Sequence, residues 1–173
     1  VEPRVALRAC SGAASFLKSC SKFVMADSED EDERACIAEL IAELGSGSEE
    51  ERWSAAHSLG CLAEDSDAAK EEIRRQGGIV PLVALMRGGG AGAQRWAAYA
   101  LFYLAYGNDA NKEEIRSHGG IEALVALVRG GGVQAQMQAA GALWCLARDN
   151  AANQATIAAA GGREALEALA RDG

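Results

Sequence analysis

The sequence predicts an all-α solenoid, a row of similar helical units, and two observations carry this prediction. The phrase GGIVPLVALMRGGG at Gly77 returns as GGIEALVALVRGGG at Gly119, and a weaker third copy starts at Gly161, after the same interval. A fixed period of this size is typical of repeat architectures. The chain also holds 20 glycines and only two prolines, as expected for many helices joined by short turns.

The first helix of each unit is predicted to be short. It falls within residues 68–78, 110–120 and 152–162, and the copies share one apolar anchor, which is Ile73, Ile115 or Ile157. Asp67, Asp109 and Asn150 precede these helices, at a place where a side-chain oxygen can cap the free backbone N–H groups. The Gly-Gly pair at the end of each copy predicts a sharp turn.

The second helix of each unit has an apolar stripe and a glycine stop. Its apolar residues recur at i, i+3, i+4 and i+7, as Ile79, Leu82, Val83 and Met86 and again as Ile121, Leu124, Val125 and Val128. Pro81 lies in the first turn, where its missing N–H removes no intrahelical hydrogen bond. The glycine triplets 88–90 and 130–132 end these helices. Phosphate-binding loops are the alternative, but neither Lys-Ser nor Lys-Thr follows the triplets.

A third helix follows in each unit. Residues 55–65, 97–107 and 139–149 align without gaps at the same period. Small and large apolar residues match in this alignment: Ala56, Ala98 and Ala140, then Leu59, Leu101 and Leu143, then Leu62, Leu104 and Leu146. Alanine beside leucine at helical spacing allows helices to approach closely, so this helix is predicted to be buried.

Three helices in each period resemble the armadillo repeat. The motifs that carry the resemblance are N-x-x-x-I-x-x-x-GG-I-x-x-L-V-x-L from Asn111 and Q-x-Q-A-A-x-A-L-x-x-L-A from Gln136. The resemblance covers residues 26–173 and implies a right-handed solenoid of about four units. HEAT repeats are the alternative, but they lack the short first helix and the Gly-Gly signature.

The expected organisation follows from this period. Residues 1–25 would form an N-terminal helical cap or worn partial repeat, with an amphipathic helix at 13–20. Residues 26–65 would form the first repeat, with an acidic and degenerate first helix, and residues 66–107 and 108–149 the second and third. Residues 150–173 would form a C-terminal partial repeat or cap.

Both end units depart from the pattern. In the first, Glu31 replaces the apolar anchor, although 36–44 still reads as a second helix, and Ser48 with Glu51 predicts a capping box for the next. In the last, Arg163 and Glu167 stand on the stripe that earlier units bury. Burying unpaired charges is costly, so we expect this stripe to face water and the solenoid to end here.

No arrangement of residues predicts catalysis, and we expect no enzyme and no cofactor. The chain has two histidines, His57 and His118, and no nucleophile–base pair can be argued from their surroundings. His57 and Cys61, at i and i+4 of one helix, could present two metal ligands, but no second pair lies nearby. We interpret them as residues that line a surface and expect no metal.

The net charge of −8 is concentrated in one segment. Residues 27–51 carry eleven acidic residues and one basic residue, and the rest of the chain is nearly balanced, with no basic surface for nucleic acid. The acidic run 27–34 is interpreted as a solvated stretch, with docking of a basic partner as the alternative. No apolar run is long enough for membrane insertion. Five scattered cysteines without C-x-x-C indicate free thiols, as in the cytoplasm or nucleus.

The remaining feature is a second, aromatic stripe on one third helix, formed by Tyr99, Phe102, Tyr103 and Tyr106. The armadillo resemblance implies that third helices line a concave groove, where importin-alpha-like members grip a peptide with a ladder of Trp and Asn. In this chain the Asn positions hold Cys61, Tyr103 and Cys145, and the Trp positions hold His57, Tyr99 and Gly141. Nuclear import is therefore not favoured, and recognition through side-chain pockets is expected.

We therefore predict a non-catalytic interaction scaffold or adaptor that binds a peptide or helix of a partner protein. The predicted groove consists of Trp53, His57, Cys61, Glu64, Arg95, Tyr99, Phe102, Tyr103, Tyr106, Met137, Trp144, Cys145 and Arg148. One alternative is a structural module whose aromatic surface is covered by a homodimer or by further repeats. Another is that several of these rings only fill gaps between alanine-rich helices.

Overall fold

The structure is a computed structural model, and it describes residues 29–172. All regular secondary structure within this range is α-helical. The helices are α2 (Glu29–Ser46), α3 (Glu49–Asp65), α4 (Asp67–Arg75), α5 (Ile79–Gly88), α6 (Ala91–Ala105), α7 (Asp109–Ser117), α8 (Gly120–Gly130), α9 (Val133–Ala147), α10 (Ala151–Ala159) and α11 (Gly162–Asp172). The expected N-terminal cap, residues 1–25, lies outside the described residues.

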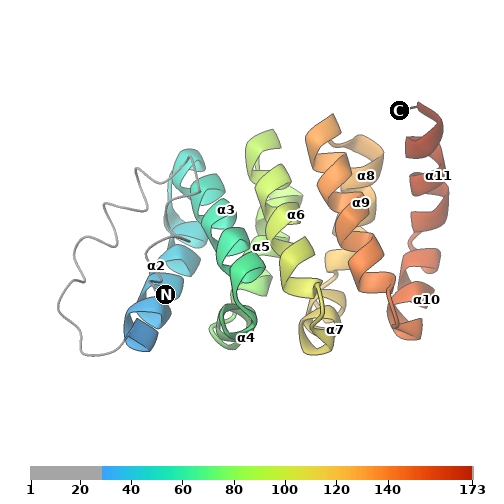
Figure 1. The fold of residues 1–173 in the computed structure, drawn as a ribbon. Coiled ribbons are helices and arrows are strands. Elements are labelled where there is room, and N and C mark those ends of the chain that lie inside the picture. The colour runs from blue at the N-terminus through green and yellow to red at the C-terminus, as the bar shows by residue number, and fades with distance from the viewer. Residues whose placement is uncertain (1–28, 173) are drawn as a thin grey trace.

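The helices form three rows that run along the molecule (Figure 1). The third helices of successive units, α3, α6 and α9, lie side by side, and the first helices α4, α7 and α10 line one edge. Corresponding helices begin one sequence period apart, α6 at Ala91 and α9 at Val133. The predicted unit of a short, a medium and a long helix is confirmed for residues 67–147, and the chain is an all-α solenoid.

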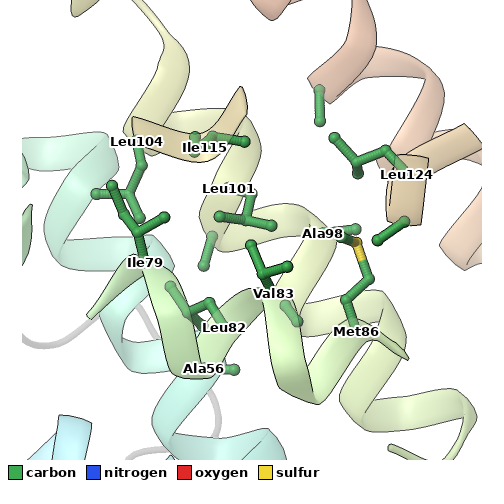
Figure 2. Close-up of a cluster of buried hydrophobic side chains, with 14 of the residues drawn as sticks. Ala56, Ile79, Leu82, Val83, Met86, Ala98, Leu101, Leu104, Ile115 and Leu124 are labelled. Atoms are coloured by element: carbon green, nitrogen blue, oxygen red, sulfur yellow. The ribbon is translucent and has the colours of Figure 1, made fainter. Parts of the chain in front are cut away.

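The core lies between the three rows and is built from the predicted stripes. Figure 2 shows Ile79, Leu82, Val83 and Met86 of α5 among side chains of α6, with Ile115 and Leu124 of the next unit close by. Most predicted apolar positions are fully or almost fully buried. Each leucine or isoleucine removed from water in this way contributes about 1.5–3 kcal/mol, so the stacking of units holds the fold together.

A glycine with positive φ makes the turn between first and second helices. Gly77, Gly119 and Gly161 have φ of 74°, 71° and 72°, a left-handed conformation that other residues adopt only at a cost. The equivalent position in the first unit is Ala35. The sequence predicts separate first and second helices within 26–44, but α2 runs unbroken from Glu29 to Ser46 because no glycine is present to make the turn.

The N-caps of the first helices were predicted one residue too late in two units. Ser66, Asn108 and Asn150 are the capping residues, and each side-chain oxygen accepts a hydrogen bond from a backbone N–H three residues on. Asp67 and Asp109 are instead the first residues of α4 and α7. Their carboxylates pair with the lysine three residues later, at 2.7 Å and 2.9 Å.

Buried lysines fasten the first helices α4 and α7 to the end of the third helix of the same unit. Lys70 Nζ donates to the backbone oxygen of Tyr106 (3.1 Å), and Lys112 Nζ donates to that of Arg148 (3.0 Å). These oxygens follow the ends of α6 and α9, where helical carbonyls lack intrahelical partners and a cation is favoured. The sequence analysis did not single out either lysine, although both stand at the same position of the repeat.

Arginines on the second helices make a similar connection. Arg87 of α5 donates to the oxygen of Gly119 (2.8 Å), and Arg129 of α8 donates to that of Gly161 (2.9 Å). Each bond therefore ties a second helix to the left-handed turn of the next unit. The register between units is fixed by these polar contacts as well as by apolar packing.

Two predictions about the end units agree with the structure. Ser48 and Glu51 form the predicted capping box at the start of α3. Arg163 and Glu167 of α11 are exposed to water, as expected from their charges. None of the helices in residues 29–172 combines the length and the apolar character that a membrane span needs.

Candidate partner-binding surface

All thirteen predicted site residues lie on the third helices or directly after them. We call the outer side of α3, α6 and α9 the third-helix face. Residues one period apart stand at the same height on it, so that Trp53, Arg95 and Met137 form one row across the helices. Glu64, Tyr106 and Arg148 form another row near the other end. The two halves of this face differ: in one the side chains already contact one another, and in the other they are exposed to water.

Between α3 and α6 the side chains form a connected aromatic cluster. The ring of His57 lies 4.0 Å from that of Trp96, and Trp96 lies 5.5 Å from Tyr99 in an edge-to-face contact. Tyr99 in turn contacts Tyr103 at 4.9 Å. Trp96 was not among the predicted site residues, although its place beside the aromatic stripe was a signal that could have included it.

Glu64 closes this cluster by accepting hydrogen bonds from both tyrosines. The Tyr99 hydroxyl donates to Oε2 (2.7 Å) and the Tyr103 hydroxyl donates to Oε1 (2.8 Å). One carboxylate of α3 thus holds two rings of α6. Three residues predicted to meet a partner therefore make strong contacts with one another.

Two glycines receive aromatic rings from the neighbouring third helix. A Cβ at Gly60 of α3 would overlap Cδ1 of Tyr99, and a Cβ at Gly141 of α9 would lie 3.2 Å from Cδ2 of Phe102. Each ring occupies space that any larger residue would fill. Tyr99 and Phe102 are consequently part of the packing between units, as the gap-filling alternative expects.

The electrostatics of the cluster follow from its burial. Burial, assisted by the hydrogen bond to Glu64, raises the pKa of Tyr103 to about 12, and the pKa of Tyr99 is raised further by the same two causes. Burial, and then the charge of Arg95, lowers the pKa of His57. At neutral pH the cluster therefore presents two neutral hydroxyl donors and a neutral imidazole.

The half of the face between α6 and α9 is open. Its large apolar side chains are exposed, namely Tyr106 (48%), Met137 (60%) and Trp144 (58%), together with Val133 (71%), which the sequence analysis did not include. Tyr106 and Trp144 line a hollow of about 380 Å³, along with Lys112 and Arg148. Cys145 is only 2% exposed and can offer a partner little contact area.

The helix α9 itself carries no charge. The charged residues of this open half line the hollow and are Asp109, Lys112, Arg148 and Asp149. The Arg95 guanidinium lies 4.4 Å above the Trp96 ring, and that of Arg148 lies 5.5 Å from the Trp144 ring. Arg148 Nε is 3.6 Å from Asp149 Oδ2, whereas Arg95 has no ion pair with any residue in 29–172.

The residues present suggest no metal centre. Cys61 Sγ lies 3.6 Å from His57 Nε2, a contact that a thiol donor explains. Within residues 29–172 no group of three or more His, Cys, Asp or Glu side chains is placed to hold an ion. Burial raises the pKa of Cys145, which keeps this thiol protonated and weakens it as a metal ligand or nucleophile.

Residues 108–148, which comprise α7, α8 and α9, match the profile of the armadillo/beta-catenin-like repeat. The chain is an armadillo repeat solenoid. A search of curated protein sequences found no match. Among solved structures, the solenoid is similar to an engineered protein at 31% identity and a TM-score of 0.75, over 82% of this chain and 60% of that one. This armadillo chain thus spans 60% of the length of that relative.

Two designed armadillo repeat proteins share the fold. One, in complex with the peptide (KR)4, is 20% identical with a TM-score of 0.72, over 90% of this chain and 67% of that one. The other was computationally designed for modular peptide recognition and is 21% identical with a TM-score of 0.72, over 88% and 74%. At these identities the likeness concerns the armadillo fold alone.

Proposed function

We propose that this armadillo solenoid is a non-catalytic scaffold that binds a peptide or helix of a partner protein on its third-helix face. The observation that carries the proposal is the exposure of Tyr106 and Trp144 around one hollow, with exposed Met137 on the same helix as Trp144 and a cluster of satisfied groups on the other half of the face. Large exposed aromatic side chains in a shallow depression are typical of binding hot spots. We propose that contact is concentrated between α6 and α9, and that the residues between α3 and α6 support it.

The comparisons support binding of this general kind. The designed relative in complex with (KR)4 holds a peptide, and the other was made for peptide recognition. We propose no catalytic role, because the contact of Cys61 with His57 lies outside the hollow and the cysteine in the hollow, Cys145, is buried. The scattered cysteines, which form no C-x-x-C motif, favour action in the cytoplasm or nucleus.

A capture experiment with matched variants tests the proposal. Wild-type protein, the double variant Tyr106→Ala with Trp144→Ala, and the control Val80→Ala are immobilised at equal density and incubated with the same extract. Val80 is also exposed, but it lies on the second helix α5. We expect one or more proteins to be retained by wild type and control and lost from the double variant. Equal retention by all three, with circular dichroism showing intact folds, would place binding elsewhere.

The same exposed side chains favour one alternative, in which a second copy of the chain covers them. Light scattering distinguishes it: a stable dimer that Trp144→Ala dissociates would make the third-helix face a self-association surface. A monomer over the concentrations used for capture supports the scaffold proposal.

A further inference from the structure

We propose that the ligand of the third-helix face is an amphipathic α-helix of another protein, lying along α9, with carboxylates beside its apolar stripe. This inference rests on the proposed function and adds the shape and charge of the partner. Three observations support it. Most of the exposed apolar side chains follow α9, few groups nearby could bind the backbone of an extended chain, and two arginines, Arg95 and Arg148, stand near the ends of the stripe.

Three of the four large exposed apolar residues of the third-helix face run along one helix, and the fourth, Tyr106, follows the end of α6. Val133, Met137 and Trp144 stand at i, i+4 and i+11 of α9 and, at about 100° per residue, lie within roughly 40° of one another. They cover about 16 Å of helix length. The same positions on α6 hold Ala91, Arg95 and the packed Phe102, so no comparable stripe crosses to the neighbouring helix. A ligand that follows such a stripe packs helix against helix.

An extended peptide would find few partners for its backbone. Every N–H and C=O group of a strand needs a hydrogen bond, whereas a helix satisfies nearly all of them internally. Along the middle of the third-helix face, the Tyr103 hydroxyl is engaged by Glu64, Cys145 is buried and Cys61 contacts His57. These three side chains, which stand where a strand would need partners, are thus occupied or inaccessible.

The charges at the two ends of the stripe favour an acidic partner. Arg95 stands at the height of Met137 and has no ion pair within residues 29–172, and Arg148 follows the C-terminal end of α9. Asp109 and Asp149, the nearby carboxylates, each already face a cation, at 2.9 Å and 3.6 Å. A carboxylate of a partner would therefore meet Arg95 at one end and share Arg148 with Asp149 at the other, whereas a lysine would be repelled most strongly beside Arg95.

The test uses synthetic peptides of about 20 residues, long enough to form helix. The parent peptide has leucines at i, i+3, i+4 and i+7 flanked by glutamates. A second version replaces the glutamates by lysines, a third carries a central proline that breaks the helix, and a fourth scrambles the leucines. Each is labelled, and its affinity for the whole chain is measured by fluorescence anisotropy at low and high salt.

We expect the glutamate peptide to bind at least about tenfold more tightly than the other three, with helix formation visible by circular dichroism. Trp144→Ala should weaken it by about tenfold or more, and Arg95→Gln by a few-fold, with the Arg95 effect disappearing at high salt. Val80→Ala and Arg171→Gln serve as matched apolar and cationic controls, because both side chains are exposed away from α9. These controls should leave affinity unchanged.

Three outcomes would overturn the inference. Equal affinity for the glutamate and lysine peptides would contradict the proposed acidic character of the ligand. Undiminished binding of the proline version would indicate an extended ligand. Failure of every peptide to bind would contradict the proposal that the ligand is a helix. In each case the capture experiment still decides the proposed function separately. A dimer that Trp144→Ala dissociates would remove both, because a second copy would then occupy the stripe.

Discussion

The carboxylate of Glu64 is the most informative single group, because it ties two tyrosines of the next unit to α3. The pKa of Tyr103, about 12, is above the value of about 10 expected in the unfolded chain. Its contribution to the free energy of unfolding is therefore complete below pH 10 and is lost as the pH rises through 12.

Glu64→Gln should lower the pKa of Tyr103 towards its ordinary value, since an amide has one acceptor oxygen where the carboxylate has two and carries no charge. Absorbance of tyrosinate during an alkaline titration measures this shift. The variant should also lose less stability than wild type between pH 10 and 12 in denaturant unfolding. If the stabilities of the two proteins fell in parallel between pH 10 and 12, the role given to Glu64 would be contradicted.

Gly60 should tolerate no side chain. Gly60→Ala is expected to destabilise the protein by about 1–3 kcal/mol, because the new methyl group meets the Tyr99 ring and lies 3.2 Å from Cα of Ala100. The control Gly92→Ala, where nothing lies within 4 Å, should be neutral or stabilising by up to about 1 kcal/mol. Urea unfolding measures both, and adding Tyr99→Ala to Gly60→Ala should recover part of the loss.

Periodicity identified the face on which the aromatic residues lie, but not what they contact there. That Tyr99 enters the space at Gly60 depends on the distance between α3 and α6, which no pattern within one helix contains. The capping residues show the opposite case. Ser66, Asn108 and Asn150 recur at the constant period, whereas the assignment of Asp67 and Asp109 broke it, so the spacing alone could have corrected the prediction.

Among the elements, α2 lacks a connection that α5 and α8 have. Arg87 and Arg129 bind the turn glycine of the next unit, and the equivalent residue of α2 is Gly45, where an added Cβ would meet nothing within 4 Å. The first unit therefore lacks this contact with the second, although Glu64 and Arg34 supply other polar contacts between them. It also carries a glycine inside a helix, where glycine is unfavourable.

Gly45→Arg should restore the connection by donating to the carbonyl of Gly77. We expect the free energy of unfolding to rise by about 1 kcal/mol from helix propensity and by about 0.5–1 kcal/mol more from the hydrogen bond. Gly45→Ala is the control that isolates propensity, and thermal unfolding compares the two. An arginine variant no more stable than the alanine variant would show that no bond to the turn forms.

The existence, order and lengths of helices in the inner units could be predicted, because each helix repeats an apolar stripe between glycines. The first unit could not be divided correctly, because a degenerate sequence still has helical periodicity through Ala35 and only the missing glycine reveals that the turn is gone. The lysine and arginine connections were missed for another reason. Their acceptors are backbone carbonyls, which have no signature in the sequence.

For the whole molecule, stability should decrease towards α10 and α11. Units of a solenoid contact only their neighbours, and this pair packs against one unit while exposing Arg163 and Glu167. Amide hydrogens of α10 and α11 should therefore exchange faster than those of α5 to α8 in hydrogen–deuterium exchange followed by mass spectrometry. Equal or greater protection in α10 and α11 would contradict this gradient.

The polar connections within and between units also determine how such a chain can change in length. Lys70 and Lys112 each reach an acceptor 36 residues ahead, and Arg87 and Arg129 each reach one 32 residues ahead. A gene duplication that inserts one whole period at a unit boundary preserves all four separations, and a deletion of the same size does so for the units that remain. An insertion of any other size within a unit moves donors away from their carbonyls, so growth by whole units is the change this architecture tolerates.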